Sequence, residues 1–142
     1  MNIRAAMLLI AICACSGAYA EPLKRKVTEF GLYSADRKLL RQTRTIPNEH
    51  GARFGFCYEI SGMEEDGSFM LVESLMHAVM KDAKGVEGTG YSVPRMYRFR
   101  NGTARGCLGY GFDRELPVTP GSWRFTISDG GDEVVVHEFT VR

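Results

Sequence analysis

The chain of 142 residues lacks an excess of charge of either sign, because 18 Lys and Arg stand against 17 Asp and Glu. Arg4 is the only charged residue among the first twenty, so the remainder is balanced as well. Proteins that bind nucleic acid or anionic membrane surfaces normally carry a basic excess. We therefore expect no nucleic-acid partner.

Motifs of catalysis and metal binding are also missing. The three histidines, His50, His77 and His137, lie far apart, without the local pairing that usually marks zinc or copper ligands. The sequence contains no G-x-S-x-G elbow and no C-x-x-C pair. It therefore predicts no catalytic residues, no cofactor and no metal site. The alternative is an enzyme or metal-binding protein that uses loop residues.

Long apolar runs are absent, apart from a short one near the start. Ala5 to Ala14 is about ten residues long, well below the roughly twenty that span a bilayer. Arg4 precedes this run and Ala18-Tyr19-Ala20 follows it, which is the layout of a secretory signal. We predict a cleaved signal peptide over residues 1–20 and a periplasmic or secreted protein. No transmembrane segment is expected after its removal.

A bacterial lipobox is the rival interpretation of the same segment. Ile12-Cys13-Ala14-Cys15 places a small residue before a cysteine that could carry lipid. The cysteine at the second position of this motif departs from the usual small or hydroxyl residue. Lipid anchoring through Cys15 is therefore the less favoured hypothesis, because Ala18-Tyr19-Ala20 matches a cleavage site better.

The part after the signal, residues 21–142, is long enough for one domain with a single core. Short segments rich in β-branched and aromatic residues alternate with Gly and Pro turn signals. This pattern predicts an all-β fold, an antiparallel β-sandwich of about seven strands. Expected strands include residues 27–33, 38–46, 53–60, 123–127 and 134–141.

Residues 53–60 form the clearest expected strand. Its aromatic and aliphatic side chains fall at alternate positions and therefore on one face. Alternating aromatics on strands normally fill the interior of a sandwich. The predicted core side chains are Phe54, Phe56, Tyr58, Trp123 and Phe125.

Ser68 to Asp82 fits two structures. Leu71, Leu75 and Val79 stand at helical spacing, which slightly favours a helix on periodicity alone. A long buried strand has the same composition, and the segments on both sides are strand-like. Strand is our first interpretation and helix the second.

An Asn101-Gly102 turn predicts a hairpin, because both residues tolerate the positive φ of a type I′ turn. Counting outward from the turn, Arg98 should face Arg105 and Met96 should face Cys107. The candidate contact surface is the set of arginines on this hairpin: Arg95, Arg98, Arg100 and Arg105. Guanidinium groups in such a cluster could hold an anionic ligand or a carboxylate-bearing partner. Neighbouring acids on a solvated face are the alternative explanation.

Cys57 and Cys107 are the only cysteines that remain after signal removal. Both fall on the polar face of their strands, and exposed thiols oxidise outside the cytoplasm. If the two strands are neighbours, a disulfide across the outer face is possible. Two unpaired cysteines remain the alternative.

Several stretches of the sequence resemble the DUF3859 family, exported bacterial domains of unknown function. The most specific are TxxIPxxxGxxFGFxY, here Thr43 to Tyr58, and ELxxxPGxW, here Glu115 to Trp123. The resemblance implies an immunoglobulin-like sandwich and transfers no activity or binding residue. In the family, the segment matching Leu71 to Ala78 resembles a strand that ends in His-Pro, whereas this chain has Ala78 in place of the proline.

These observations together predict a non-catalytic exported domain that acts by binding. Strands and turns account for nearly every distinctive residue of the sequence, and no reactive set is left over. The expected partner is another envelope protein or an anionic ligand.

Overall fold

The protein is described here from a computed structural model, which covers residues 21–112 and 119–142. These residues form nine strands that pack as two sheets, without a helix among them. Seven strands are long and two are short. The strands are β1 (Lys24–Tyr33), β2 (Leu39–Arg41), β3 (Thr45–Ile46), β4 (Arg53–Ser61), β5 (Gly67–Lys81), β6 (Glu87–Phe99), β7 (Thr103–Gly111), β8 (Gly121–Asp129) and β9 (Asp132–Val141).

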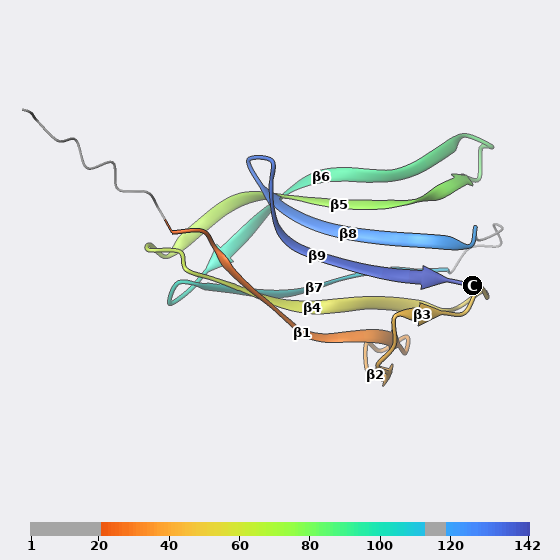
Figure 1. The fold of residues 1–142 in the computed structure, drawn as a ribbon, viewed down its shortest axis with the longest axis horizontal. Coiled ribbons are helices and arrows are strands. Elements are labelled where there is room, and N and C mark those ends of the chain that lie inside the picture. The colour runs from red at the N-terminus through yellow and green to blue at the C-terminus, as the bar shows by residue number, and fades with distance from the viewer. Residues whose placement is uncertain (1–20, 113–118) are drawn as a thin grey trace, which may run out of the picture.

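The two sheets lie face to face as the layers of a sandwich (Figure 1). One has four strands in the order β2-β1-β4-β7, and the other has five in the order β3-β9-β8-β5-β6. Neighbouring strands are antiparallel except for the short β3, which pairs with β9 in parallel. The predicted all-β sandwich is confirmed.

Alternate side chains of the facing strands fill the space between the sheets. On β4, Phe54, Phe56, Tyr58 and Ile60 are buried in the core, while the residues that alternate with them lie on the outer face. Trp123 on β8 is fully buried, and its ring meets the Phe54 ring edge to face at 5.6 Å between centroids. The predicted core side chains therefore form the core, because period-two alternation places them all on inner faces.

Segment 68–82 is a strand. β5 lies between β6 and β8, so its backbone hydrogen bonds go to neighbours on both sides. Leu71 and Leu75 point inward, whereas Met70 and Met76 are exposed. The helical spacing of its apolar residues is coincidental, because tertiary pairing overrides a weak local preference.

The single strand expected over residues 38–46 is wrong. The chain instead forms β2 at the edge beside β1 and then β3 at the edge of the other sheet. The hydroxyl of Thr43 accepts a hydrogen bond from the Thr45 N–H and donates one to the Thr45 carbonyl. Such local bonds compete with a sheet ladder, and the chain changes sheets at this point.

The Asn101-Gly102 turn has positive φ at both residues, 51° and 69°, as predicted. The strand pairing predicted outward from this turn is wrong, because the two strands separate after one bridge, between Arg100 and Thr103. β6 pairs with β5 in one sheet and β7 with β4 in the other. Consequently Arg98 is opposite Ser68 and Arg105 is opposite Glu59, while Met96 is opposite Met70.

The proposed signal peptide, residues 1–20, and the possible lipid anchor at Cys15 lie outside the described residues. The same holds for residues 113–118, which include part of the ELxxxPGxW stretch. In the described part of the chain, no helix is long and apolar enough to cross a membrane.

The alternation on β4 predicts how stability responds to truncation. Phe56 is fully buried, so Phe56→Ala should lower the free energy of unfolding by about 3–5 kcal/mol. Met76→Ala, at a side chain that is 62% exposed, should change it by less than about 0.5 kcal/mol. Urea unfolding of both variants measures the difference, and equal losses would contradict the inward orientation of Phe56.

Candidate functional site

Three of the predicted contact arginines lie on or next to β6, the free edge strand of the five-stranded sheet. The Nε atom of Arg95 is 3.7 Å from Oε2 of Glu73, and the other carboxylate oxygen, Oε1, accepts a hydrogen bond from the Tyr97 hydroxyl. Arg98 is exposed and makes no ion pair with any described residue. The edge of β6 therefore carries guanidinium groups that are only partly neutralised.

Arg100 follows β6 and lies near Asp66. Backbone hydrogen bonds from Gly102 and Asn101, together with the charge of Arg100, lower the pKa of the Asp66 carboxyl. The fourth arginine, Arg105, lies on the other sheet, where its Nε donates to Glu59 at 2.8 Å. The sandwich thus divides the predicted cluster into three arginines along β6 and one paired arginine on β7.

Exposed apolar side chains gather on the same hairpin, formed by β5, β6 and the turn between them. Six of the seven large apolar side chains that are exposed in the described residues lie there, and Leu40 on β2 is the other. The six are Met70, Met76, Val79, Val86, Tyr91 and Met96. Exposed apolar groups that cluster beside charged ones are typical of interaction surfaces.

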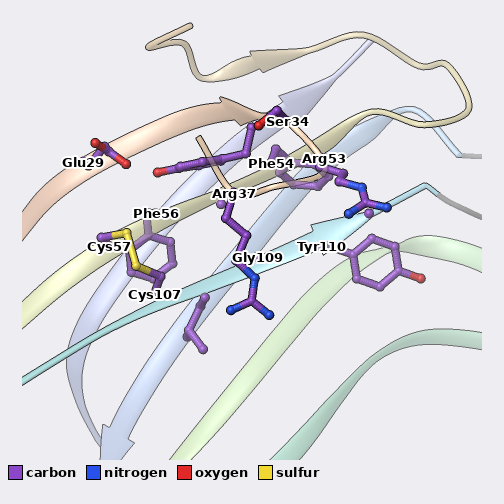
Figure 2. A pocket seen from close by; sticks show the side chains of 14 residues that line it. Glu29, Ser34, Arg37, Arg53, Phe54, Phe56, Cys57, Cys107, Gly109 and Tyr110 are labelled. Atoms are coloured by element: carbon purple, nitrogen blue, oxygen red, sulfur yellow. A yellow bond between two sulfur atoms is a disulfide. The ribbon is translucent and has the colours of Figure 1, made fainter. Parts of the chain in front are cut away.

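A second feature lies on the four-stranded sheet, on the face turned away from the core. A groove of about 570 Å³ crosses β1, β4 and β7 there (Figure 2). Gly55 and Gly109 face each other in register at its floor. Glu29, Cys57 and Cys107 form a row on one side, because Cys57 is in register with both of the others.

Gly55 and Gly109 must be glycines, because the backbone of the neighbouring strand leaves no room for a Cβ atom at either position. A Cβ atom on Gly55 would lie 2.2 Å from the carbonyl oxygen of Leu108, and one on Gly109 would lie 2.7 Å from that of Phe54. Both contacts are too short for any side chain, so the floor is bare backbone. The pattern of glycines on the outer face of two paired strands was the sequence signal for this groove, and the sequence prediction missed it.

Arg37 projects over the groove from the turn between β1 and β2, and Figure 2 shows its side chain reaching toward Gly109. Its φ is 64°, in the left-handed region that few residues other than glycine adopt. Hydrogen bonds hold this turn: the Ser34 N–H donates to the Lys38 carbonyl, and the Arg37 N–H donates to the Ser34 carbonyl. Arg53 supports the turn through a bond of 3.4 Å to the Ala35 carbonyl.

Tyr33 lines the groove beside Glu29. Burial and then the neighbouring Glu29 carboxylate raise the pKa of the Tyr33 hydroxyl. No hydrogen bond of normal geometry joins the two groups, and the hydroxyl oxygen is shielded from solvent. The groove therefore combines the Glu29 carboxylate, the Tyr33 ring and two guanidinium groups, those of Arg37 and Arg53, over a backbone floor.

Cys57 and Cys107 form a disulfide, with an S–S distance of 2.06 Å. The two residues are in register on the neighbouring strands β4 and β7, so the bond lies on the outer face of the sheet, as predicted. It closes a separation of 50 residues and borders the groove. Disulfides of this kind persist in oxidising compartments.

The three histidines stay apart. His50 is exposed in a loop, His77 stacks on Trp123 at 4.5 Å, and His137 is buried among Phe56, Phe139 and other rings. Within the described ranges, no group of three or more His, Cys, Asp or Glu side chains is placed to hold a metal ion.

Comparison with protein families identifies the chain. The DUF3859 profile, described only as a domain of unknown function, matches residues 21–141. The chain belongs to the DUF3859 family. No curated protein matches it.

Solved structures show the fold of this DUF3859 domain. An immunoglobulin-like protein, PA1606 of Pseudomonas aeruginosa, is similar with a TM-score of 0.69 and 21% identity, over 87% of this chain and 98% of that one. A mutant β-glucosidase from Listeria innocua in complex with laminaribiose has a TM-score of 0.50 and 11% identity, over 84% of this chain and 16% of that one. At these identities the likeness shows an immunoglobulin-like sandwich and nothing of the activity.

The disulfide gives a prediction for the stability of the DUF3859 domain. Replacing both cysteines, Cys57→Ser with Cys107→Ser, should lower the free energy of unfolding by about 4 kcal/mol, because a loop of this length gains entropy in the unfolded chain. Denaturant titration under oxidising conditions measures the loss. Wild-type protein with reductant should behave like the variant, and an unchanged midpoint in both would refute the prediction.

His137 predicts how the stability of the domain depends on pH. Burial and then the charge of Arg44 lower the pKa of His137 from 6.5 to about 4. The unfolded chain therefore binds a proton more readily, so the stabilisation is complete above pH 6.5 and is lost as the pH falls toward 4. The steepest loss is about 1.4 kcal/mol per pH unit.

Replacing the His137 side chain should remove its contribution to the pH dependence of the free energy of unfolding. The free energy of unfolding of His137→Phe should fall less between pH 6.5 and 4 than that of the wild type. His50→Phe, at an exposed histidine, should follow the wild-type profile. Parallel profiles for His137→Phe and the wild type would show that His137 does not carry the dependence.

Proposed function

We propose that the protein is an exported, non-catalytic binding domain that captures another envelope protein through its β5–β6 hairpin. The observation that carries this proposal is the gathering of six exposed large apolar side chains on one hairpin, next to guanidinium groups that are not fully paired. Surfaces with an apolar centre and arginine at the border are typical of protein interfaces.

The geometry favours a partner with a specific chemistry. Met70 and Met96 lie directly opposite each other on the outer face of the hairpin, where flexible thioether side chains can adapt to an apolar surface. Arg98 lies one step further along the same face of β6. The complementary surface would carry apolar side chains beside carboxylates, which Arg98 and Arg100 would contact.

Export is supported by the disulfide and by the sequence of the first twenty residues. A bond between Cys57 and Cys107 is stable in the periplasm or outside the cell and is rare in the reducing cytoplasm. We infer a periplasmic or secreted location with cleavage before Glu21, and lipid attachment at Cys15 remains the alternative.

Crosslinking in living cells tests the hairpin. Met96→Asp and Arg98→Glu should each reduce the amount of the crosslinked partner by about tenfold or more, because each places a carboxylate in the proposed interface. Both side chains are exposed, so the melting temperature should change by no more than a few degrees. Quantitative mass spectrometry of the captured protein measures the effect.

Matched control variants lie on the other sheet. Leu40→Asp changes an apolar side chain that is 68% exposed, and Arg25→Glu reverses an exposed arginine on β1. Both controls should keep wild-type capture. Full capture by the hairpin variants, or an equal loss in the controls, would exclude the β5–β6 hairpin as the docking surface.

A further inference from the structure

The groove on the four-stranded sheet is separate from the β5–β6 hairpin and has its own chemistry. Its volume of about 570 Å³ lies within the range of sites for small ligands. Glu29 stands at the end that holds the disulfide, and Arg37 extends over the middle, toward Gly109 (Figure 2). Glu29 and Arg37 thus display opposite charges at different points along one open groove, while the third charged residue of its lining, Arg53, is bonded to the Ala35 carbonyl.

The turn holds the backbone of Arg37, and the side chain is available to a ligand. It is exposed, and it makes no ion pair with any residue in the described ranges. The left-handed backbone at this position is costly for arginine, and hydrogen bonds within the turn maintain it. The planar guanidinium above the groove matches a carboxylate in two-point geometry.

The charges of Glu29 and Arg37 and the glycine floor of the groove favour one chemical class of ligand over others. A neutral saccharide would leave both charges unused, and a dianion would be repelled by Glu29. An ammonium group at Glu29 and a carboxylate at Arg37 would satisfy both. The bare backbone of Gly55 and Gly109 allows a flat, extended chain to lie close to the sheet.

We propose that this groove binds a short zwitterionic peptide, with its carboxylate on Arg37 and its ammonium group at Glu29. The Tyr33 ring lines the groove near the proposed ammonium end, beside Glu29. The Cys57–Cys107 disulfide borders this end of the channel.

Trialanine and its two blocked forms test the proposal with the purified protein. Titration followed by amide chemical shifts should show saturable changes at Gly55, Cys107 and Gly109. N-acetyl-trialanine and trialanine amide should each bind about tenfold more weakly than trialanine, because each loses one charge-assisted contact. Absence of saturable shifts in the groove, or equal affinity for all three peptides, would overturn the proposal.

Two variants assign each end of the peptide. Arg37→Asn removes the guanidinium while keeping a residue that tolerates positive φ; it should weaken trialanine about tenfold and leave trialanine amide unchanged. Glu29→Gln should weaken trialanine similarly and leave N-acetyl-trialanine unchanged. If both variants lower the affinity for all three peptides equally, Arg37 and Glu29 do not contact the peptide termini and the assignment is wrong.

Lys38→Gln is the matched control, because Lys38 is an exposed cation in the same turn and pairs with Asp36 at 3.2 Å. It should keep wild-type affinity for all three peptides. A loss as large as that of Arg37→Asn would show a general charge effect and contradict a specific contact. Capture through the hairpin is measured separately and does not depend on this outcome.

Discussion

The alternation of inward-facing and outward-facing side chains along β4 is the constraint on which the rest of the structure depends. Its inner face places Phe54 and Phe56 against the rings of Trp123 and Phe125 in the opposite sheet. Its outer face presents Gly55 and Cys57 to the groove. A shift of one residue in its pairing would move the rings into solvent and the glycine into the core. The pairing register of β4 therefore determines both which side chains form the core and which residues line the groove.

The neighbour of β4 makes this register difficult to change. β7 pairs with it over nine residues, and the Cys57–Cys107 bond fixes one of these pairs covalently. Close backbone approach at Gly55 and Gly109 allows this pairing. The strand that carries the core thereby also determines where the groove lies and which side chains border it.

The sequence was sufficient for the features that depend on local periodicity. Alternating aromatics identified β4 and β8, and the Asn101-Gly102 pair identified a turn with the correct backbone conformation. It was not sufficient to show that this turn connects two different sheets. The residues flanking the turn are compatible with both arrangements, and only the ladders with β4 and β5 decide between them.

The same limit applies to the candidate sites. Arg98 and Arg100 share one face of the strand by their spacing, and Arg95 falls on the other, whereas the place of Arg105 depended on long-range pairing. The groove joins side chains from β1, the following turn, β4 and β7. No local motif contains them, since they meet only after the sheet has formed. The disulfide was predictable as a possibility because both cysteines had outer-face parity.

Pro94 lies on β6, opposite Val72, within the free edge of the five-stranded sheet. Proline has no N–H group, so this edge offers an interrupted row of donors to any further strand. Open edges without such an interruption promote fibril formation. The interruption at Pro94 therefore disfavours pairing between the β6 edges of two copies of the domain.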